Sequence, residues 1–294
     1  MSILILRLVL FAKANSKTII EVDILGMPSK KHRKLNIFFI IIGGVILALA
    51  FIYFLGLYPI AVVRSKFISN NEYEENLELA KRFTANPNRS LVFNELVEAK
   101  QKEILLDKYK ISKTGLIANE LKYYKTGNSA EYQELLQKYF SNNEKLFVDF
   151  VVARQAYDSA LKIKYNQDFG ANNTAYNRAA NILKQIQSGS SFEELALSSD
   201  DKVSGQVGGD LGFIASGQIL PELEKVINIS TIGEVKKELV ISRLGYHILY
   251  PVEISDRNGE KVWHIKHILI QTTGYDQWLE DQLKSIVVRR LINF

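Results

Sequence analysis

The sequence predicts an α+β protein in which a membrane-spanning helix is followed by a helical module and by a domain that combines helices with antiparallel strands. Three observations lead to this fold class: a long uncharged run near the N-terminus, apolar residues at helical spacing up to about residue 165, and two apolar runs joined by Asn258-Gly259 as in a β-hairpin. The chain has 294 residues, 47% of them hydrophobic and 23% charged, which is enough for two modest domains.

Charge and cysteine content limit the possible functions. The formal net charge is +5, but lysine and arginine are interleaved with acidic residues along the chain instead of clustering. This pattern argues against a nucleic-acid-binding surface. The chain contains no cysteine, which excludes disulfides and thiolate metal sites and suits a protein outside the cytoplasm. We therefore expect no nucleic-acid partner, no metal and no cofactor.

The N-terminal region predicts a single membrane anchor. Residues 35–63 contain no charged residue, and this run is longer than the roughly 20 residues that are needed to cross a bilayer. A basic cluster precedes this run and favours a cytoplasmic N-terminus: Lys30, Lys31, Arg33 and Lys34. A cleaved signal peptide would have a shorter apolar core followed by small residues. We expect an uncleaved anchor in the cell membrane, a cytoplasmic tail over residues 1–34 and extracytoplasmic domains; a buried soluble helix is the alternative.

The first 26 residues carry little pattern of their own. Their apolar stretch is short and is interrupted by Arg7, and Met27 begins a second possible start of the chain. They either precede the natural start or form a weakly structured tail.

Residues 64–165 read as a helical module. Asn128 with Glu131, and Ser141 with Glu144, are capping-box pairs that predict two helix starts. Apolar residues recur at helical spacing from Leu135 to Val151.

Six short motifs follow one another between residues 187 and 250. They are SFEELA, in which Ser191 predicts a helix cap, then the SDD turn ending at Asp201, GGDLGF, GQILPELE, GEV and GYHI. The glycines of GGDLGF could indicate a phosphate-binding loop, but a polar turn precedes them and no Lys-Ser/Thr pair follows. In this order the six motifs resemble the parvulin family of peptidyl-prolyl isomerases.

The resemblance implies a fold, an activity and a set of site residues. The fold would be a four-stranded antiparallel sheet with surrounding helices, and the activity would be cis–trans isomerisation of X–Pro bonds. His247 and His267 match the two family histidines, and Asp201 matches a position that is Asp or Cys in the family. The substrate-binding wall would contain Leu211, Ile219 and Leu223, with Leu244 at the rim, and Leu223 departs from the usual Phe.

Two alternatives for the histidines stay open. They could be core residues that only stabilise the sheet. A metal site could use His264 and His267, but residues three apart on a strand point to opposite faces.

The order of the strands departs from the family. A parvulin begins with a strand before its first helix, here predicted over residues 175–188, but residues 167–174 are polar. A matching strand lies instead at residues 263–270. We predict a circularly permuted parvulin domain over residues 175–271; a truncated second repeat starting at Lys266 is the alternative. Residues 272–294 would form a helix and a return segment that pack on the helical module.

The helical module has a looser resemblance of its own. Residues 61–69 and 91–111 are similar to the N-terminal chaperone module of SurA-type parvulin proteins, although Ser65-Lys66 replaces an Asn-Gly turn. An unrelated helical spacer is the alternative.

The two histidines constrain the hairpin that carries them. A regular hairpin closed at Asn258-Gly259 would place them on opposite faces of the sheet. A shared site therefore requires an irregularity, and Pro251–Glu253 is the expected place because proline favours bulges.

Taken together, the sequence predicts a membrane-anchored extracytoplasmic foldase that isomerises X–Pro bonds of unfolded polypeptides and holds them on its helical module. A holdase with weak or no isomerase activity is one alternative, favoured by Leu223. A structural membrane protein that uses both domains as docking surfaces is another.

Overall fold

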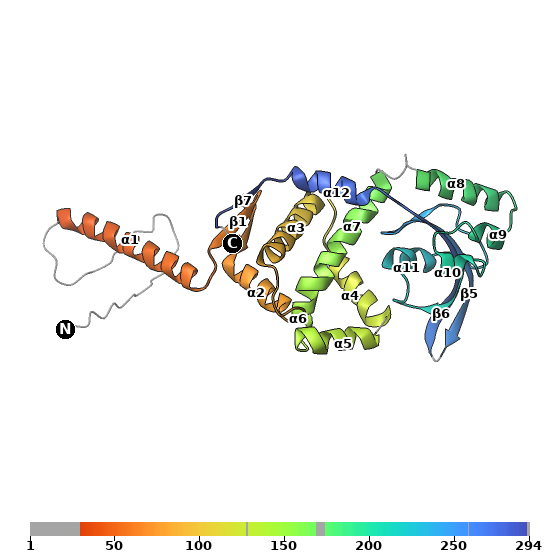
Figure 1. Cartoon of the computed structure of the whole chain (residues 1–294), viewed down its shortest axis with the longest axis horizontal. Coiled ribbons are helices and arrows are strands. Elements are labelled where there is room, and N and C mark those ends of the chain that lie inside the picture. The colour runs from red at the N-terminus through yellow and green to blue at the C-terminus, as the bar shows by residue number, and fades with distance from the viewer. Residues whose placement is uncertain (1–29, 128, 169–173, 258, 293–294) are drawn as a thin grey trace, which may run out of the picture. The chain divides into compact units, whose positions relative to one another are not determined.

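The computed structural model describes residues 30–127, 129–168, 174–257 and 259–292. The chain divides into two compact units, residues 1–55 and 56–294 (Figure 1). The described part of the first unit is helix α1 (Lys30–Phe54). Among the described residues, no helix has both the length and the hydropathy that crossing a bilayer requires. The tail predicted for residues 1–34 lies outside the described residues as far as residue 29.

The predicted span of residues 35–63 does not form one continuous helix. Helix α1 ends at Phe54, and Pro59–Val63 form strand β1. Gly56 adopts a φ of +66°, a left-handed conformation that stops a helix. Ile60, Ala61 and Val63 are then fully buried in a protein core. The boundary was wrong because a buried strand and a membrane helix are equally apolar and the run has no polar break between them.

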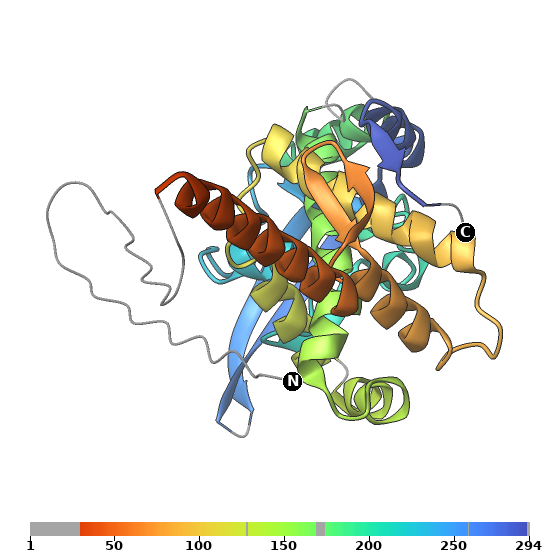
Figure 2. The ribbon, with the colours of Figure 1, turned by 90° about the vertical axis from the view of Figure 1, so that its left-hand side faces the viewer.

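A small antiparallel sheet opens the second unit. Its strands are β1, β2 (Lys66–Ser69) and β7 (Val288–Arg290), in the order β2-β1-β7. In Figures 1 and 2, the C-terminal strand β7 lies beside β1, which is far from it in sequence.

A helical module packs on this sheet. Its helices are α2 (Asn70–Ala80), α3 (Arg89–Lys108), α4 (Leu116–Gly127), α5 (Ser129–Phe140), α6 (Glu144–Phe147), the π-helix η1 (Val148–Val152), α7 (Ala153–Asp168) and α12 (Tyr275–Lys284). Helix α12 is the helix expected within residues 272–294, and it shares a core cluster with α3 and β1, as the predicted packing on the helical module requires. The cap of α6 is Asn143, which accepts from the N–H of Leu146; Ser141 was the wrong candidate. The predicted cap Asn128 lies outside the described residues.

The sheet domain, residues 174–271, carries the sequence motifs. Its elements are α8 (Thr174–Gln187), α9 (Phe192–Ala196), α10 (Lys202–Gly205), β3 (Asp210–Ala215), α11 (Pro221–Ile227), β4 (Val240–Ile241), β5 (Gly245–Arg257) and β6 (Glu260–Gln271). The strands form one antiparallel sheet in the order β3-β6-β5-β4. Ser191 caps α9 as predicted, accepting from the N–H of Glu194.

Each face of this sheet has its own hydrophobic core. On one face, α8 and α9 pack against Tyr246, Ile248 and Ile268. On the other, Leu223 and Ile227 of α11 pack against Leu249 and neighbouring side chains. His247 alternates with Tyr246 and Ile248 along β5, so it points to the α11 face.

The hairpin of β5 and β6 contains the predicted irregularity. Pairing is regular from Arg257↔Glu260 to Glu253↔His264, and then Pro251 pairs with Ile265. The additional residue on β5 shifts the register by one. His267 consequently lies opposite Leu249, and His247 opposite Leu269, so both histidines share a face. The prediction of a bulge at Pro251–Glu253 is confirmed.

Candidate active site

The two histidines form a stacked pair at the centre of the sheet. Their ring centroids are 5.6 Å apart and the ring planes differ by 29°. Both side chains are buried, His247 with 1% and His267 with 6% of its surface exposed. The β5 bulge therefore produces the juxtaposition that a shared site needs.

His267 is held from helix α10. Its Nε2 atom lies 3.0 Å from Asp201 Oδ2 and 3.0 Å from Ser204 Oγ. The Ser204 hydroxyl donates to Asp201 Oδ2 at 2.7 Å, so its oxygen is free to accept from the ring. Asp201 also caps α10, accepting from the N–H groups of Val203 and Ser204. We assign the proton of His267 to Nε2, because both of its partners accept.

His247 is held from the loop between β4 and β5. Its Nε2 atom lies 2.8 Å from Ser242 Oγ. The N–H of Leu244 donates to the same oxygen at 3.0 Å. The Ser242 hydroxyl is then the donor to His247 Nε2, and we assign the ring proton of His247 to Nδ1. Among the described residues, neither histidine Nδ1 atom has a hydrogen-bond partner, so the pair presents one buried N–H and one buried lone pair.

Electrostatics keep both rings neutral and the acid charged. Burial, and then the neighbouring His267, lower the pKa of His247 to about 3. Burial also lowers the pKa of His267, although the Asp201 carboxylate opposes it. For Asp201 burial alone would raise the pKa, but hydrogen bonds from Ser204 and His267 outweigh it and the pKa is lowered. At neutral pH the site has two uncharged imidazoles beside one anion.

The glycine loop before β3 fixes the backbone of His267. The N–H of His267 donates to Gly209 O at 2.8 Å, and Gly209 has a φ of +80°. A Cβ atom at this position would overlap the carbonyl oxygen of His267. Asp210 accepts from the N–H of Gly212 at 2.7 Å and lies 2.8 Å from His264 Nε2. Asp210 thus holds the loop, and His264 belongs to this support.

Comparison with known proteins connects this geometry to a family. Residues 161–253 match the family of PPIC-type PPIASE domains, described as rotamases. The sheet domain is a parvulin domain. Strand β6 and His267 lie beyond the matched residues.

Proteins similar to this chain are named as a foldase, a chaperone and a peptidylprolyl isomerase. The chain is 26% identical over 179 residues to the foldase protein PrsA 2 of Bacillus cereus, covering 56% of this chain and 61% of that protein. It is 34% identical over 112 residues to the chaperone SurA of Nitrosospira multiformis, covering 36% of this chain and 25% of the relative. The chain thus spans about three fifths of the length of the foldase. A crystal structure of the peptidylprolyl isomerase PrsA from Bacillus anthracis has 23% identity and a TM-score of 0.22, covering 65% and 86% of the two chains.

Three of the four apolar residues expected to bind substrate belong to one cluster of the parvulin domain: Leu211, Ile219 and Leu223. Leu211 and Ile219 are partly buried and pack against this cluster. Leu223 is only 1% exposed and is one of the buried residues of the cluster itself. Leu244 is 43% exposed at the end of the β4–β5 loop, two residues after Ser242, which bonds to His247. Whether these residues bind a proline ring stays a prediction.

Two hydroxyl groups of the parvulin domain were not found from the sequence. Ser204 follows Asp201 by three residues, a spacing within one helical turn that could have indicated a shared role. No sequence pattern pointed to Ser242, because its hydrogen bond with His247 forms only through the turn between β4 and β5.

Proposed function

We propose that this protein isomerises X–Pro bonds in unfolded polypeptides and acts as a folding factor. The observation that carries the proposal is the neutral, buried histidine pair beside the Asp201 carboxylate. Rotation about a peptide bond has a barrier of about 18–20 kcal/mol that arises from amide resonance, so no covalent bond has to break. A thousandfold acceleration requires only roughly 4 kcal/mol of preferential binding to the twisted amide.

The arrangement can provide this stabilisation without a cofactor. Leu211 and Ile219 offer an apolar surface for the proline ring, and hydrogen bonds with Ser204 and His267 hold the Asp201 carboxylate in place. Because both imidazoles are neutral and fixed by hydrogen bonds, the site is preorganised and needs little rearrangement when the amide twists. Its role is to bind the twisted state, not to attack the substrate.

The test is a protease-coupled assay with a proline tetrapeptide and the full-length chain. We expect acceleration over the uncatalysed reaction, and a loss of most of it in His267→Gln. His32→Gln is the matched control, since this histidine lies on α1, outside the parvulin domain. A folded wild-type chain that does not accelerate the reaction would rule out the isomerase function.

A second function, holding unfolded chains, is favoured by a cavity in the helical module. The cavity has a volume of about 310 Å³ and its apolar lining includes Leu79, Phe83, Leu91, Phe140 and Phe150. Phe83 and Leu91 are 55% and 56% exposed, which is high for side chains of this size. Such a surface suits an apolar segment of an unfolded polypeptide.

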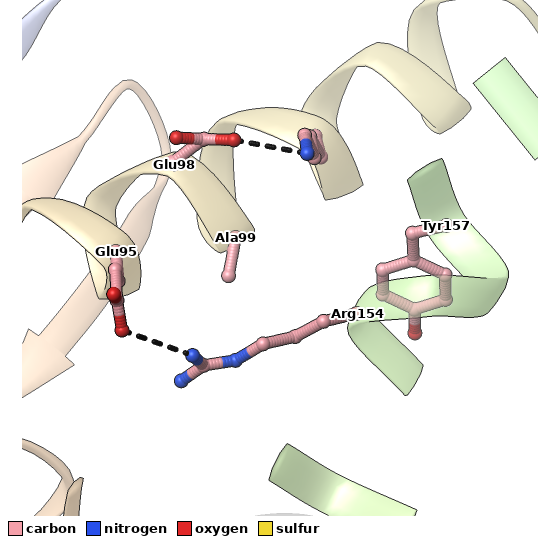
Figure 3. Close-up of a pocket in the computed structure, with 6 residues that line it drawn as sticks. Glu95, Glu98, Ala99, Arg154 and Tyr157 are labelled. Atoms are coloured by element: carbon pink, nitrogen blue, oxygen red, sulfur yellow. Dashed lines mark ion pairs between the residues drawn. The ribbon is translucent and has the colours of Figure 1, made fainter. Parts of the chain in front are cut away.

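A smaller cavity of about 120 Å³ adjoins the first through the shared residues Glu95 and Arg154. In Figure 3, Arg154 extends from α7 toward Glu95 on α3, and the two form an ion pair at 3.6 Å. Tyr157 faces the same space.

Phe83→Ser, in the larger cavity, should reduce the ability of the chain to suppress aggregation of a denatured test protein while proline isomerisation is unchanged. Equal suppression of aggregation by wild type and by Phe83→Ser would contradict the holding function.

We also propose that the parvulin domain is circularly permuted. Support comes from strand β6, which pairs with both β3 and β5 although it follows them in the chain. The family match ends at residue 253, before this strand. A chain in which residues 259–273 are moved in front of α8 should fold to the same sheet, and failure of that rearranged domain to fold would contradict the permutation.

The membrane location remains a proposal that rests on the sequence and on α1. The uncharged run begins at Leu35, and many large apolar side chains of α1 are exposed: Ile41, Val45, Ile46, Leu47, Leu49, Phe51, Tyr53 and Phe54. Deletion of residues 1–55 should release a folded protein from the membrane fraction into solution. Deletion of residues 1–63 is the informative contrast, because it also removes β1 and should destabilise the fold. Unchanged solubility after the shorter deletion would contradict an anchor.

A further inference from the structure

We propose that helix α4 of the helical module positions the histidine pair of the parvulin domain through an ion pair between Glu120 and Arg243. The inference rests on the isomerase function proposed above and deepens it, because it assigns a positioning residue, Glu120, that lies outside the parvulin domain. Nothing in the motifs of that domain points to this residue.

The ion pair has the geometry of a strong contact. Arg243 Nη1 lies 2.8 Å from Glu120 Oε1, and Arg243 Nη2 lies 2.7 Å from Glu120 Oε2. The Nε atom of Arg243 donates to Glu222 Oε1 on α11 at 3.0 Å. All the guanidinium nitrogens are therefore engaged, and the contact to Glu120 is bidentate. Bidentate pairs fix orientation as well as distance.

Burial separates this contact from ordinary surface ion pairs. The side chains of Glu120 and Arg243 are 4% and 10% exposed, and that of Glu222 is 11% exposed. Exposed pairs contribute little because water screens them. A buried pair instead becomes costly when one partner is lost. The loop that carries Arg243 is thus attached firmly to α4.

The attached loop is the one that orients His247. It consists of residues 242–244, between the end of β4 and the start of β5. Ser242 bonds to His247 Nε2, Arg243 binds Glu120, and Leu244 lies at the expected rim of the substrate site. Consecutive Cα atoms are about 3.8 Å apart, so a displacement of Arg243 moves both of its neighbours.

A second helix of the module holds the same loop. The Nδ2 atom of Asn166 on α7 donates to the carbonyl oxygen of Ser242 at 2.8 Å. The Tyr246 hydroxyl donates to the carbonyl oxygen of Asn166 at 2.8 Å. Both contacts are buried. The loop is therefore held to α4 through the side chain of Arg243 and to α7 through the backbone carbonyl group of Ser242.

Helix α4 cannot shift independently of the parvulin domain. Lys122 on the same helix bonds to Ser216 Oγ at 2.9 Å and to Glu224 Oε1 at 3.3 Å. Near its end, Thr126 packs so closely on Gly217 that a Cβ atom there would overlap its side chain. Gly217 and Ser216 precede Ile219, so α4 also supports the loop that carries an expected wall residue.

The experiment compares Glu120→Ala with wild type in the full-length chain. Removal of the carboxylate leaves Arg243 paired with Glu222, so no unpaired charge is created. We expect kcat for a proline tetrapeptide to fall about tenfold, equivalent to about 1.4 kcal/mol, with KM changed much less. Glu120→Gln, which keeps the shape and can still donate and accept, serves if the alanine variant does not fold, and should show a smaller fall.

A spectroscopic measurement separates positioning from a general loss of stability. The chain has four histidines, so ¹⁵N-histidine spectra are simple to assign. In Glu120→Ala the imidazole signals of His247 should shift clearly, whereas those of His267, held from α10, should shift less, through its stacking on His247 alone. Lys102→Ala is the matched control, because it removes an ion pair within the helical module, to Asp158 at 2.8 Å, that does not reach the loop. It should change neither the spectra nor kcat.

The outcomes distinguish this inference from the function on which it rests. If wild type is folded but inactive, the isomerase proposal fails, and a selective shift of His247 still supports positioning by Glu120. If wild type is active and folded Glu120→Ala retains both its kcat and its His247 signals, positioning by α4 is wrong. Equal shifts of His247 and His267 would also overturn it, since they indicate a general loosening of the sheet.

Discussion

The two halves of the histidine pair are held in different ways. His267 is oriented by Asp201 and Ser204, which lie on a short helix of the parvulin domain itself. His247 is oriented by Ser242, whose loop is fixed by Glu120 and Asn166 of the helical module. The first support stays within the parvulin domain, 63 and 66 positions from His267. The second reaches the helical module, across 76 and 123 positions of the chain. The parvulin domain thus orients His267 with its own residues, whereas the orientation of His247 depends on residues of the helical module.

The largest expected effect comes from removing the strand that carries His267. Truncation after Gly259 deletes β6, which pairs with both β3 and β5, together with α12 and β7 of the helical module. We expect the sheet of the parvulin domain to lose its cooperative unfolding transition in chemical denaturation, because a central strand cannot be replaced by solvent. A near-native transition in the truncated chain would mean that the domain is built without this strand.

Asp201→Asn tests the support of His267, which comes from α10 within the parvulin domain. Asparagine is as good a helix cap as aspartate, so α10 should persist and stability should change little. The variant removes the anion that faces His267, and we expect kcat/KM to fall about 10- to 100-fold, equivalent to roughly 1.4–2.7 kcal/mol. The measurement is the proline tetrapeptide assay together with thermal unfolding. Full activity in a folded variant would show that the charge of Asp201 is not required.

His247, whose loop is held by the helical module, should dominate the loss of stability at acidic pH. The pKa of His247 is about 3 in the folded chain, below its usual value of about 6.5, so the unfolded state binds a proton that the folded state does not. Its contribution to stability is complete above pH 6.5 and is lost as the pH falls toward 3. Between pH 6.5 and 4.5 the loss is roughly 2–3 kcal/mol, since each pKa unit corresponds to about 1.4 kcal/mol.

Urea unfolding at pH 7.5 and pH 4.5 measures this response. His247→Gln should reduce the difference between the two conditions by most of that amount. Asp201, whose pKa is also lowered, loses its contribution in the same direction but at lower pH. An unchanged pH dependence in the variant would contradict a buried neutral His247.

Ser242→Ala gives the smallest expected effect. It leaves His247 Nε2 buried without its partner, at a cost of about 1–3 kcal/mol in the free energy of unfolding. We expect a lower melting temperature and a several-fold lower kcat, with Ser230→Ala as a control for loss of a hydroxyl in the same domain. If Ser242→Ala matches the control in both measurements, the β4–β5 loop does not hold the ring.

Local signals made much of the fold predictable. Ser191 and Glu194 marked the start of α9, and the helix expected within residues 272–294 is α12. The bulge at Pro251–Glu253 was predictable because two histidines on one face allow a single register, and proline marks where it changes. In each case the signal lies within a few residues of the structure that it determines.

The remainder depends on contacts between distant residues. Strand β1 was included in the predicted membrane segment, since its partners β2 and β7 are what distinguish it from a helix. The Glu120–Arg243 pair joins residues 123 positions apart, and neither has an unusual neighbourhood in sequence. Ser242 differs from other serines only through the turn that places it beside His247. No local pattern encodes such partnerships.

The place of β6 in the chain bears on how the protein is made. During synthesis β3, β4 and β5 leave the ribosome before the strand that must lie between β3 and β5. Until residue 271 emerges, the two edges of the gap expose unpaired backbone groups and apolar side chains, as an aggregation-prone intermediate does. The sheet therefore closes late, shortly before α12 and β7 complete the helical module. A protein that we propose to assist slow folding thus passes through a delayed assembly step of its own.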